Sequence, residues 1–189
     1  MNSVTYVLHE EDVDYCVLID CGEWETLKPV LEKIGKKVRA VLLTHAHTDH
    51  IYGINKLIET FPNALIYTNA EGEKGLQNPQ WNLSRYHDDI EDFIISSPQN
   101  VRVIDKEGSL QVDDDIMVEV LFTPGHEPSC LSFIIENNLF TGDAYIPGIG
   151  TVVSFPRSNK ISAQKTLKRL QYLEKNGLTV CAGHRIIRY

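Results

Sequence analysis

The sequence has no long apolar run and no apolar leader. No stretch of its 189 residues approaches the roughly 18–20 consecutive apolar positions that a membrane-spanning helix needs, so we expect no membrane partner. The first residues, MNSVTYVLHEEDVDY, have neither a basic start nor an apolar centre, which argues against a signal peptide. These two absences predict a cytoplasmic protein.

Basic residues are also in short supply. The chain has 18 Lys and Arg against 26 Asp and Glu, a formal net charge of −8. Binding to nucleic acid rests on a basic surface that neutralises phosphates. We therefore expect no nucleic-acid partner, whereas a small-molecule substrate remains compatible with this charge.

Cysteine is scarce and shows no metal-binding spacing. The four cysteines are Cys16, Cys21, Cys130 and Cys181, and no two of them form a CxxC pair. A chain in a reducing compartment keeps its thiols free. We expect four unpaired cysteines, which behave as small buried apolar residues.

The composition indicates one globular domain. Hydrophobic residues make up 42% of the chain and charged residues 23%, which is ordinary usage. No internal repeat or linker rich in proline, glycine and serine divides the sequence. At about 150 residues per domain, we expect a single domain over residues 1–189. Nothing in the sequence indicates an oligomeric state.

The pattern of apolar residues predicts two packed sheets with helices outside. Apolar positions in the segment 24–34 recur at the helical spacing, and the run VRAVLLT is typical of a buried strand. Ser162 is the expected N-cap of the last helix, and short strands after residue 100 predict antiparallel hairpins. We expect helices over 24–34, 51–61, 70–76 and 162–175, and strands over 3–8, 15–20, 38–44, 64–68, 101–104, 109–112, 116–123, 131–135, 138–141 and 178–182, with 77–97 irregular.

Three histidines and an aspartate gather directly after one apolar strand. The segment is His45-Ala46-His47-Thr48-Asp49-His50. Imidazole and carboxylate are ligands of divalent metals such as zinc. Residues two apart in extended chain point to the same side, so His45 and His47 can bind one ion. Asp49 and His50 fall where the next helix begins and can face a second ion.

Three later segments also follow apolar strands. They are Thr123-Pro124-Gly125-His126, Thr141-Gly142-Asp143 and Gly183-His184. Taken singly, each is typical of an ordinary turn. Their common place after apolar strands favours convergence on one edge of the sheets.

These motifs together resemble the metallo-β-lactamase superfamily. His45 to His50 is similar to its HxHxDH signature, and TPGH, TGD and GH match its later motifs in the same order. VLIDCG at 17–22 resembles the strand and turn before the family's first helix. LQNPQWNLS at 76–84 resembles the glyoxalase II-like branch, whose members are hydroxyacylglutathione hydrolases.

The resemblance implies an α/β fold, a four-layer αββα sandwich, and a site for two divalent metal ions. Zinc is the expected metal, with iron and manganese as alternatives. A metal-bridged hydroxide would cleave a thioester or related ester, with Asp49 as its hydrogen-bond partner and Asp20 orienting a metal histidine. By motif, His45, His47 and His126 would hold the first ion, Asp49, His50 and His184 the second, and Asp143 would bridge both.

The sequence departs from the family pattern at three places. Ile51-Tyr52-Gly53 stands where Gly-Gly is frequent, and Glu127 follows His126 where a small residue is usual. We also expect no counterpart of the helical domain with which glyoxalase II enzymes bind glutathione. The resemblance implies a hydroxyacylglutathione hydrolase-like activity without by itself specifying a glutathione thioester as the substrate.

The sequence offers few candidates for residues that contact the substrate. It also leaves alternative functions open. Tyr145, Arg157 and Lys160 are candidates to contact substrate, although solvent-exposed charge is the simpler interpretation of the last two. A lactonase or β-lactamase-like hydrolase is the alternative enzyme. An iron-dependent redox or oxygen-handling protein, or a binding module without catalysis, would be a different class.

Overall fold

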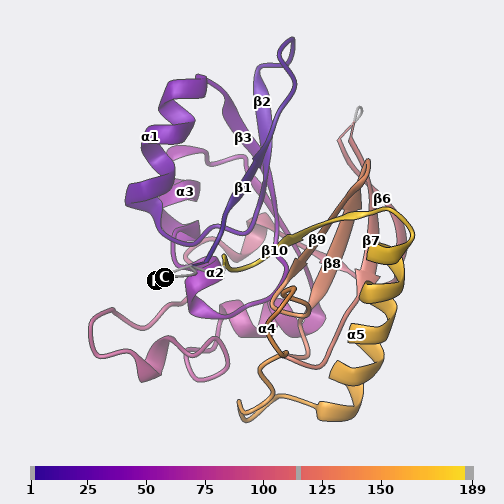
Figure 1. Cartoon of the computed structure of the whole chain (residues 1–189). Helices are drawn as coiled ribbons and strands as arrows, with labels where there is room; N and C mark the ends of the chain where they lie inside the picture. Colours follow the sequence, from indigo (N-terminus) through magenta and orange to yellow (C-terminus); the bar gives the residue numbers. More distant parts are fainter. Residues whose placement is uncertain (1–2, 114–115, 186–189) are drawn as a thin grey trace.

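Two five-stranded sheets face each other in the middle of the molecule (Figure 1). The computed structural model of the chain describes residues 3–113 and 116–185. The first sheet has the order β1 (Tyr6–Leu8), β2 (Tyr15–Ile19), β3 (Lys37–Leu42), β4 (Leu65–Asn69) and β5 (Val101–Ile104). The second has the order β10 (Thr179–Ala182), β9 (Asn138–Gly142), β8 (Leu131–Ile135), β7 (Ile116–Phe122) and β6 (Gly108–Asp113).

Helices cover the outer faces of both sheets. In Figure 1, α1 (Trp24–Ile34) and α3 (Ile54–Thr60) flank the first sheet, and α5 (Lys160–Lys175) flanks the second. The order of layers is therefore helix, sheet, sheet, helix, as expected for the αββα sandwich. The short elements α2 (Thr48–Ile51), α4 (Ala70–Leu76), η1 (Ser84–Tyr86) and η2 (Pro98–Asn100) lie in the connections.

Apolar side chains fill each of the three interfaces between layers. Strand β2 shows how, because Val17 and Ile19 join the core between the sheets while Leu18 joins the core under α1 and α3. A strand buried on both faces must be apolar at every position, which explains the run YCVLI. Under α5, Leu170 packs against the outer face of the second sheet with Leu139.

Several segment predictions are confirmed, whereas a strand pairing and a helix start differ from the prediction. The helices over 24–34 and 70–76 are found with the expected bounds. The expected antiparallel partner for 101–104 is wrong, since β5 pairs parallel to β4 in the first sheet. The N-cap of α5 is Asn159, whose side chain accepts from the Ser162 amide at 2.9 Å, so the helix begins two residues earlier than expected.

The expected single helix over 51–61 is broken in two. Helix α2 ends at Ile51, and α3 begins at Ile54. The Gly53 amide donates to the Cys21 carbonyl at 3.0 Å, and a Cβ at Gly53 would lie 2.7 Å from the Gly22 carbonyl oxygen. The chain bends here because it packs directly on the loop that follows β2.

Two expectations about the whole chain can also be compared with the structure. All four cysteines are free. Within the described ranges, no helix has both the length and the apolar character needed to traverse a bilayer.

The turn before His126 requires a glycine. Gly125 has a φ of +144°, and a Cβ there would lie 2.3 Å from backbone atoms of Ala163 in α5. Backbone strain and forced displacement of a helix should together cost at least about 2 kcal/mol. We expect Gly125→Ala to lower the free energy of unfolding by that amount in denaturant titrations. Gly150→Ala, where a Cβ meets nothing within 4 Å, is the control and should be nearly neutral; equal effects would contradict this account.

Candidate metal centre

Seven histidine and aspartate side chains meet at one edge of the two sheets. The first sheet contributes the loop after β3 and the helix α2 that follows it, and the second contributes the turns after β7, β9 and β10. Because the ends of these strands lie at the same edge, segments far apart in sequence deliver their side chains to one place. The residues are His45, His47, Asp49, His50, His126, Asp143 and His184.

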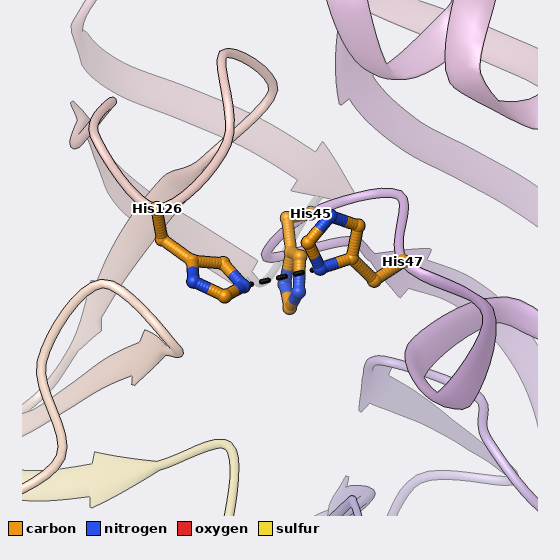
Figure 2. A group of neighbouring side chains, drawn as sticks. All are labelled: His45, His47 and His126. Atoms are coloured by element: carbon orange, nitrogen blue, oxygen red, sulfur yellow. Dashed lines mark hydrogen bonds between the residues drawn. The ribbon is translucent and has the colours of Figure 1, made fainter. Parts of the chain in front are cut away.

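Three buried histidines form the first group, and their rings point toward one another (Figure 2). His126 comes from the second sheet, whereas His45 and His47 come from the first. The Nε2 atom of His126 lies 3.1 Å from Nδ1 of His47. The Nδ1–H of His126 donates to the Val152 carbonyl at 2.8 Å, which leaves its Nε2 free to face the group.

Asp49, His50 and His184 form the second group, beside Asp143. The Nε2 atoms of His50 and His184 are 3.4 Å apart. His184 Nε2 lies 3.3 Å from Oδ2 of Asp49 and 3.3 Å from Oδ2 of Asp143. Asp143 also lies 3.7 Å from His126 Nε2, so its carboxylate stands between the two groups.

The donor set and its spacing fit two divalent ions. Two atoms that bind one ion at about 2.0–2.1 Å with tetrahedral angles lie about 3.3 Å apart, close to the separations in both groups. Within the described part of the chain, His45 Nε2 and Asp143 Oδ1 are buried with no hydrogen-bond partner. Such atoms are costly unless something binds them, and both belong to the groups just described.

Asp20 holds the second group in place from behind. Its carboxylate accepts from the Thr44 amide and hydroxyl, both at 2.7 Å, and from Nδ1–H of His50 at 2.7 Å. This fixes the His50 tautomer, so that Nε2 faces the other ligand atoms. Asp20 adopts a left-handed conformation with φ +61°, which the three hydrogen bonds maintain. The expected role of Asp20 as a partner of a metal histidine is supported by these contacts.

The two groups differ in charge. Burial lowers the pKa of His45 well below its usual value and that of His47 to about 3, so both imidazoles are neutral near pH 7. Burial also disfavours charge on His50, but the carboxylates of Asp20 and Asp143 outweigh it and raise its pKa well above the usual value. Hydrogen bonds to Asp143 and Asp49 raise the pKa of His184 to about 10. Without metal, His50 and His184 of the second group are therefore protonated near neutral pH.

Asn82 connects the irregular segment after α4 to helix α2. Its carbonyl accepts from the Thr48 amide at 2.8 Å and from the Thr48 hydroxyl at 2.6 Å, at the start of α2. Its side chain donates to the carbonyls of Gly75 and Phe93. The Asn-x-Ser pattern in the sequence was the only signal for this role.

The three candidate substrate residues take different places. Arg157 lies beside His47, where it lines a cavity of about 190 Å³. The prediction for Tyr145 is wrong, because its ring packs with Leu139 and Leu170 under α5 and its hydroxyl donates to Glu174 at 2.7 Å. Lys160 is exposed at the start of α5 and lines a separate hollow, so it does not reach the cluster either.

Sequence reasoning missed Phe155 and Trp81. The ring of Phe155 lies edge-on to His47 and His126, with centroids 5.1 and 5.5 Å away. Trp81 lies across the same cavity and stacks under the guanidinium of Arg157. Neither residue carries a metal-binding group, and both come from irregular segments, so no periodic pattern marked them.

Comparison with known proteins agrees with this geometry. The sequence model described as the metallo-beta-lactamase superfamily matches residues 1–184. A hydroxyacylglutathione hydrolase from Blochmanniella pennsylvanica is 27% identical over 171 residues, which are 89% of this chain and 57% of that protein. This chain therefore spans little more than half the length of that relative.

Two solved structures share the fold over nearly the whole chain. The B3 metallo-beta-lactamase BLEG-1 superposes with a TM-score of 0.83 at 24% identity, covering 98% of this chain and 88% of that one. TTHA1623 in a di-iron-bound form superposes with a TM-score of 0.77 at 25% identity, covering 97% and 88%. From the family match and the clustered ligand residues together, we conclude that the chain belongs to the metallo-beta-lactamase superfamily.

Proposed function

We propose that the chain is a two-metal hydrolase that cleaves a thioester or a related activated ester of a small molecule. The observation that carries the proposal is the convergence of seven histidine and aspartate side chains, two of which present buried atoms without a hydrogen-bond partner in the described structure. In this proposal the ions are zinc. His45, His47 and His126 would hold the first ion and Asp49, His50 and His184 the second, and the Asp143 carboxylate lies between the two groups.

Divalent ions bound by these residues would supply a water of lowered pKa and polarisation of the scissile carbonyl. Asp49 accepts a hydrogen bond from the attacking water. Burial disfavours charge on Asp49, but its hydrogen bond with His184 outweighs this and holds its pKa below the usual value, so it is an anionic acceptor at neutral pH. Its side chain is 30% exposed, the most open carboxylate of the cluster, and therefore faces incoming substrate.

The remaining residues of the site orient these groups. Asp20 holds the His50 ring, and the Val152 carbonyl holds the His126 ring. Phe155 covers the first group on one side and limits access of bulk water to it. A dry, rigid surround strengthens every electrostatic interaction with the developing oxyanion.

Removal of one ligand tests the proposal. Protein purified without added metal should contain about two zinc ions per chain and hydrolyse at least one member of a panel of thioesters, lactones and a chromogenic β-lactam. His47→Ala should lower thioester turnover at least about 100-fold and reduce metal content, since loss of even an outer partner of a ligand costs 10–100-fold.

The control for this experiment is His9→Ala, which removes an exposed histidine outside the cluster and should leave turnover unchanged. Bound iron with no hydrolysis would contradict the proposal and favour the redox class. Preference for the β-lactam or a lactone would keep the two-metal mechanism and replace the substrate.

Asp20→Asn tests the support behind His50. Asparagine tolerates the left-handed backbone, so the fold should persist. Its amide group would face Nδ1 of His50 in place of an acceptor, which favours the tautomer whose Nε2 carries a proton and cannot bind metal. We expect affinity for the second ion to fall about 10–100-fold in chelator competition. Asp12→Asn, in an exposed turn, is the matched control; equal affinities in both variants would show that Asp20 is not a support.

Metal binding should release protons from the second group. The pKa of His184 is about 10 without metal and that of His50 is also raised, so both carry protons near pH 7.5 that must leave before the nitrogens bind. We expect calorimetry in buffers of different ionisation enthalpy to show release of about two protons per chain. The apparent affinity should fall as the pH falls. His184→Ala should release about one proton fewer, whereas a release independent of this variant would contradict the assignment.

A further inference from the structure

The cavity beside His47 is small and mostly apolar. It has a volume of about 190 Å³, below the 300–1,000 Å³ common for sites that enclose a drug-sized ligand. It therefore accommodates one group of a substrate rather than a whole peptide-like molecule. Its walls are Trp81, Leu83, Tyr86, Phe155 and Pro156, with Gln80, Arg157 and His47 completing the lining.

Arg157 is the only permanently charged residue among those that line the cavity, and its charge is already matched. Its guanidinium contacts Glu71 through Nη2 and lies 2.8 Å from Oε1 of Glu127 through Nη1. The other oxygen of Glu71 binds Lys74 at 2.6 Å. Two cations and two carboxylates thus neutralise one another, so these four side chains offer an anionic group no surplus positive charge.

The contacts of Arg157 instead hold Trp81 in the cavity wall and, through Glu127 and Ser129, the loop that carries His45 and His47. Its Cζ lies 3.9 Å from the centre of the Trp81 ring, which fixes that wall by a cation–π contact. Glu127 is 2% exposed and accepts from the Ser129 amide and hydroxyl. The Ser129 hydroxyl in turn accepts from the amide of Ala46, between His45 and His47, at 3.0 Å.

One residue of the cavity wall has an unfavourable backbone conformation. Leu83 has φ +68°, a conformation that residues with a side chain adopt rarely. Asn82 and Ser84 hold it on either side, since the Ser84 amide donates to the Asn82 side chain and the Ser84 hydroxyl accepts from the Phe93 amide. Strain of this kind persists only where the surroundings fix it, and here it lies on the wall of the cavity.

We propose that this cavity receives an uncharged, apolar group of the substrate, aromatic or branched, and that Arg157 is a positioning residue rather than an anion-binding one. The inference rests on the proposed function only for the assignment of that group to a thioester or ester. The shape of the cavity and its paired charges support the uncharged, apolar character of that group and the positioning role of Arg157. Discrimination against a carboxylate at this site follows, because the side chains that line the cavity offer no unpaired cation to compensate for desolvation of the anion.

Matched substrates test the charge selectivity. One series contains the para-methylbenzoyl and para-carboxybenzoyl thioesters of N-acetylcysteamine, which are alike in shape and differ in charge. The second contains the acetyl thioesters of para-methyl- and para-carboxythiophenol, so that either side of the scissile bond is sampled. We expect kcat/KM to favour the neutral member at least about tenfold in one series. Equal or higher values for the carboxylated member in both series would overturn the inference.

The variant Glu71→Gln tests whether the carboxylates neutralise Arg157. Freeing part of its charge should narrow the preference for the neutral substrate about two- to fivefold, as expected for a partly exposed ion pair. Glu73→Gln removes the same charge from the same helix without a described contact to Arg157, and should leave the ratio unchanged. If the two variants give the same ratio of kcat/KM for the neutral and the carboxylated substrate, the pairing of Glu71 with Arg157 does not set the preference and the inference fails.

Binding without turnover separates this inference from the proposed function. Para-toluamide should change the intrinsic fluorescence of the metal-free protein, and the change should be lost in Trp81→Phe, while Trp24 remains in its buried place. Para-carboxybenzamide should bind at least about tenfold more weakly. If toluamide binds in this way and no ester is hydrolysed, the hydrolase proposal fails and the cavity assignment stands. If toluamide leaves the Trp81 signal unchanged, the cavity assignment fails whatever the turnover.

Discussion

The carboxylate of Asp20 is the interaction on which the metal centre depends. It is buried, and its three hydrogen bonds join the end of β2 to the end of β3 through Thr44 and to α2 through His50. A buried carboxylate that lost these donors would be strongly destabilising. The same bonds that satisfy Asp20 therefore also fix the direction in which the ligand loop leaves the sheet, and they do so at a left-handed residue.

A second network of hydrogen bonds, which starts at Glu127 beside the second sheet, also supports the loop that carries His45 and His47. Glu127 follows His126 and reaches Ser129, which holds Ala46 in the loop of the first sheet. The departure from the family pattern at Glu127 is thus part of the support of the site, because its charge is paired with Arg157 and its oxygens are used within the protein. Each group takes side chains from the ends of both sheets, and Ser129 also holds the loop that carries His45 and His47, so the two sheets must pack before either group is complete.

The chemistry of the site follows from unequal environments for similar side chains. His45 and His47 lie where burial dominates and are neutral, whereas His184 lies beside two carboxylates and keeps its proton without metal. In the proposed two-metal site, the first group would bind an ion without losing protons, and the second would bind its ion with loss of protons. Next to the first group, the cavity is lined mainly by aromatic and other apolar side chains, an apolar character that the acidic composition of the chain does not suggest.

Local sequence was sufficient for the elements and the ligand types. Continuous apolar runs identified β2 and β3, helical spacing identified α1, and the motif residues identified the seven side chains that meet at the sheet edge. The sequence could not place Tyr145 or Arg157. Tyr145 packs under α5 on the outer face of the second sheet, whereas Arg157 lies in the cavity beside His47. The sequence also could not reveal the break before α3 or the parallel pairing of β5. These features arise from contacts between segments distant in the chain, such as Gly53 with Cys21, and only the packed sheets bring those segments together.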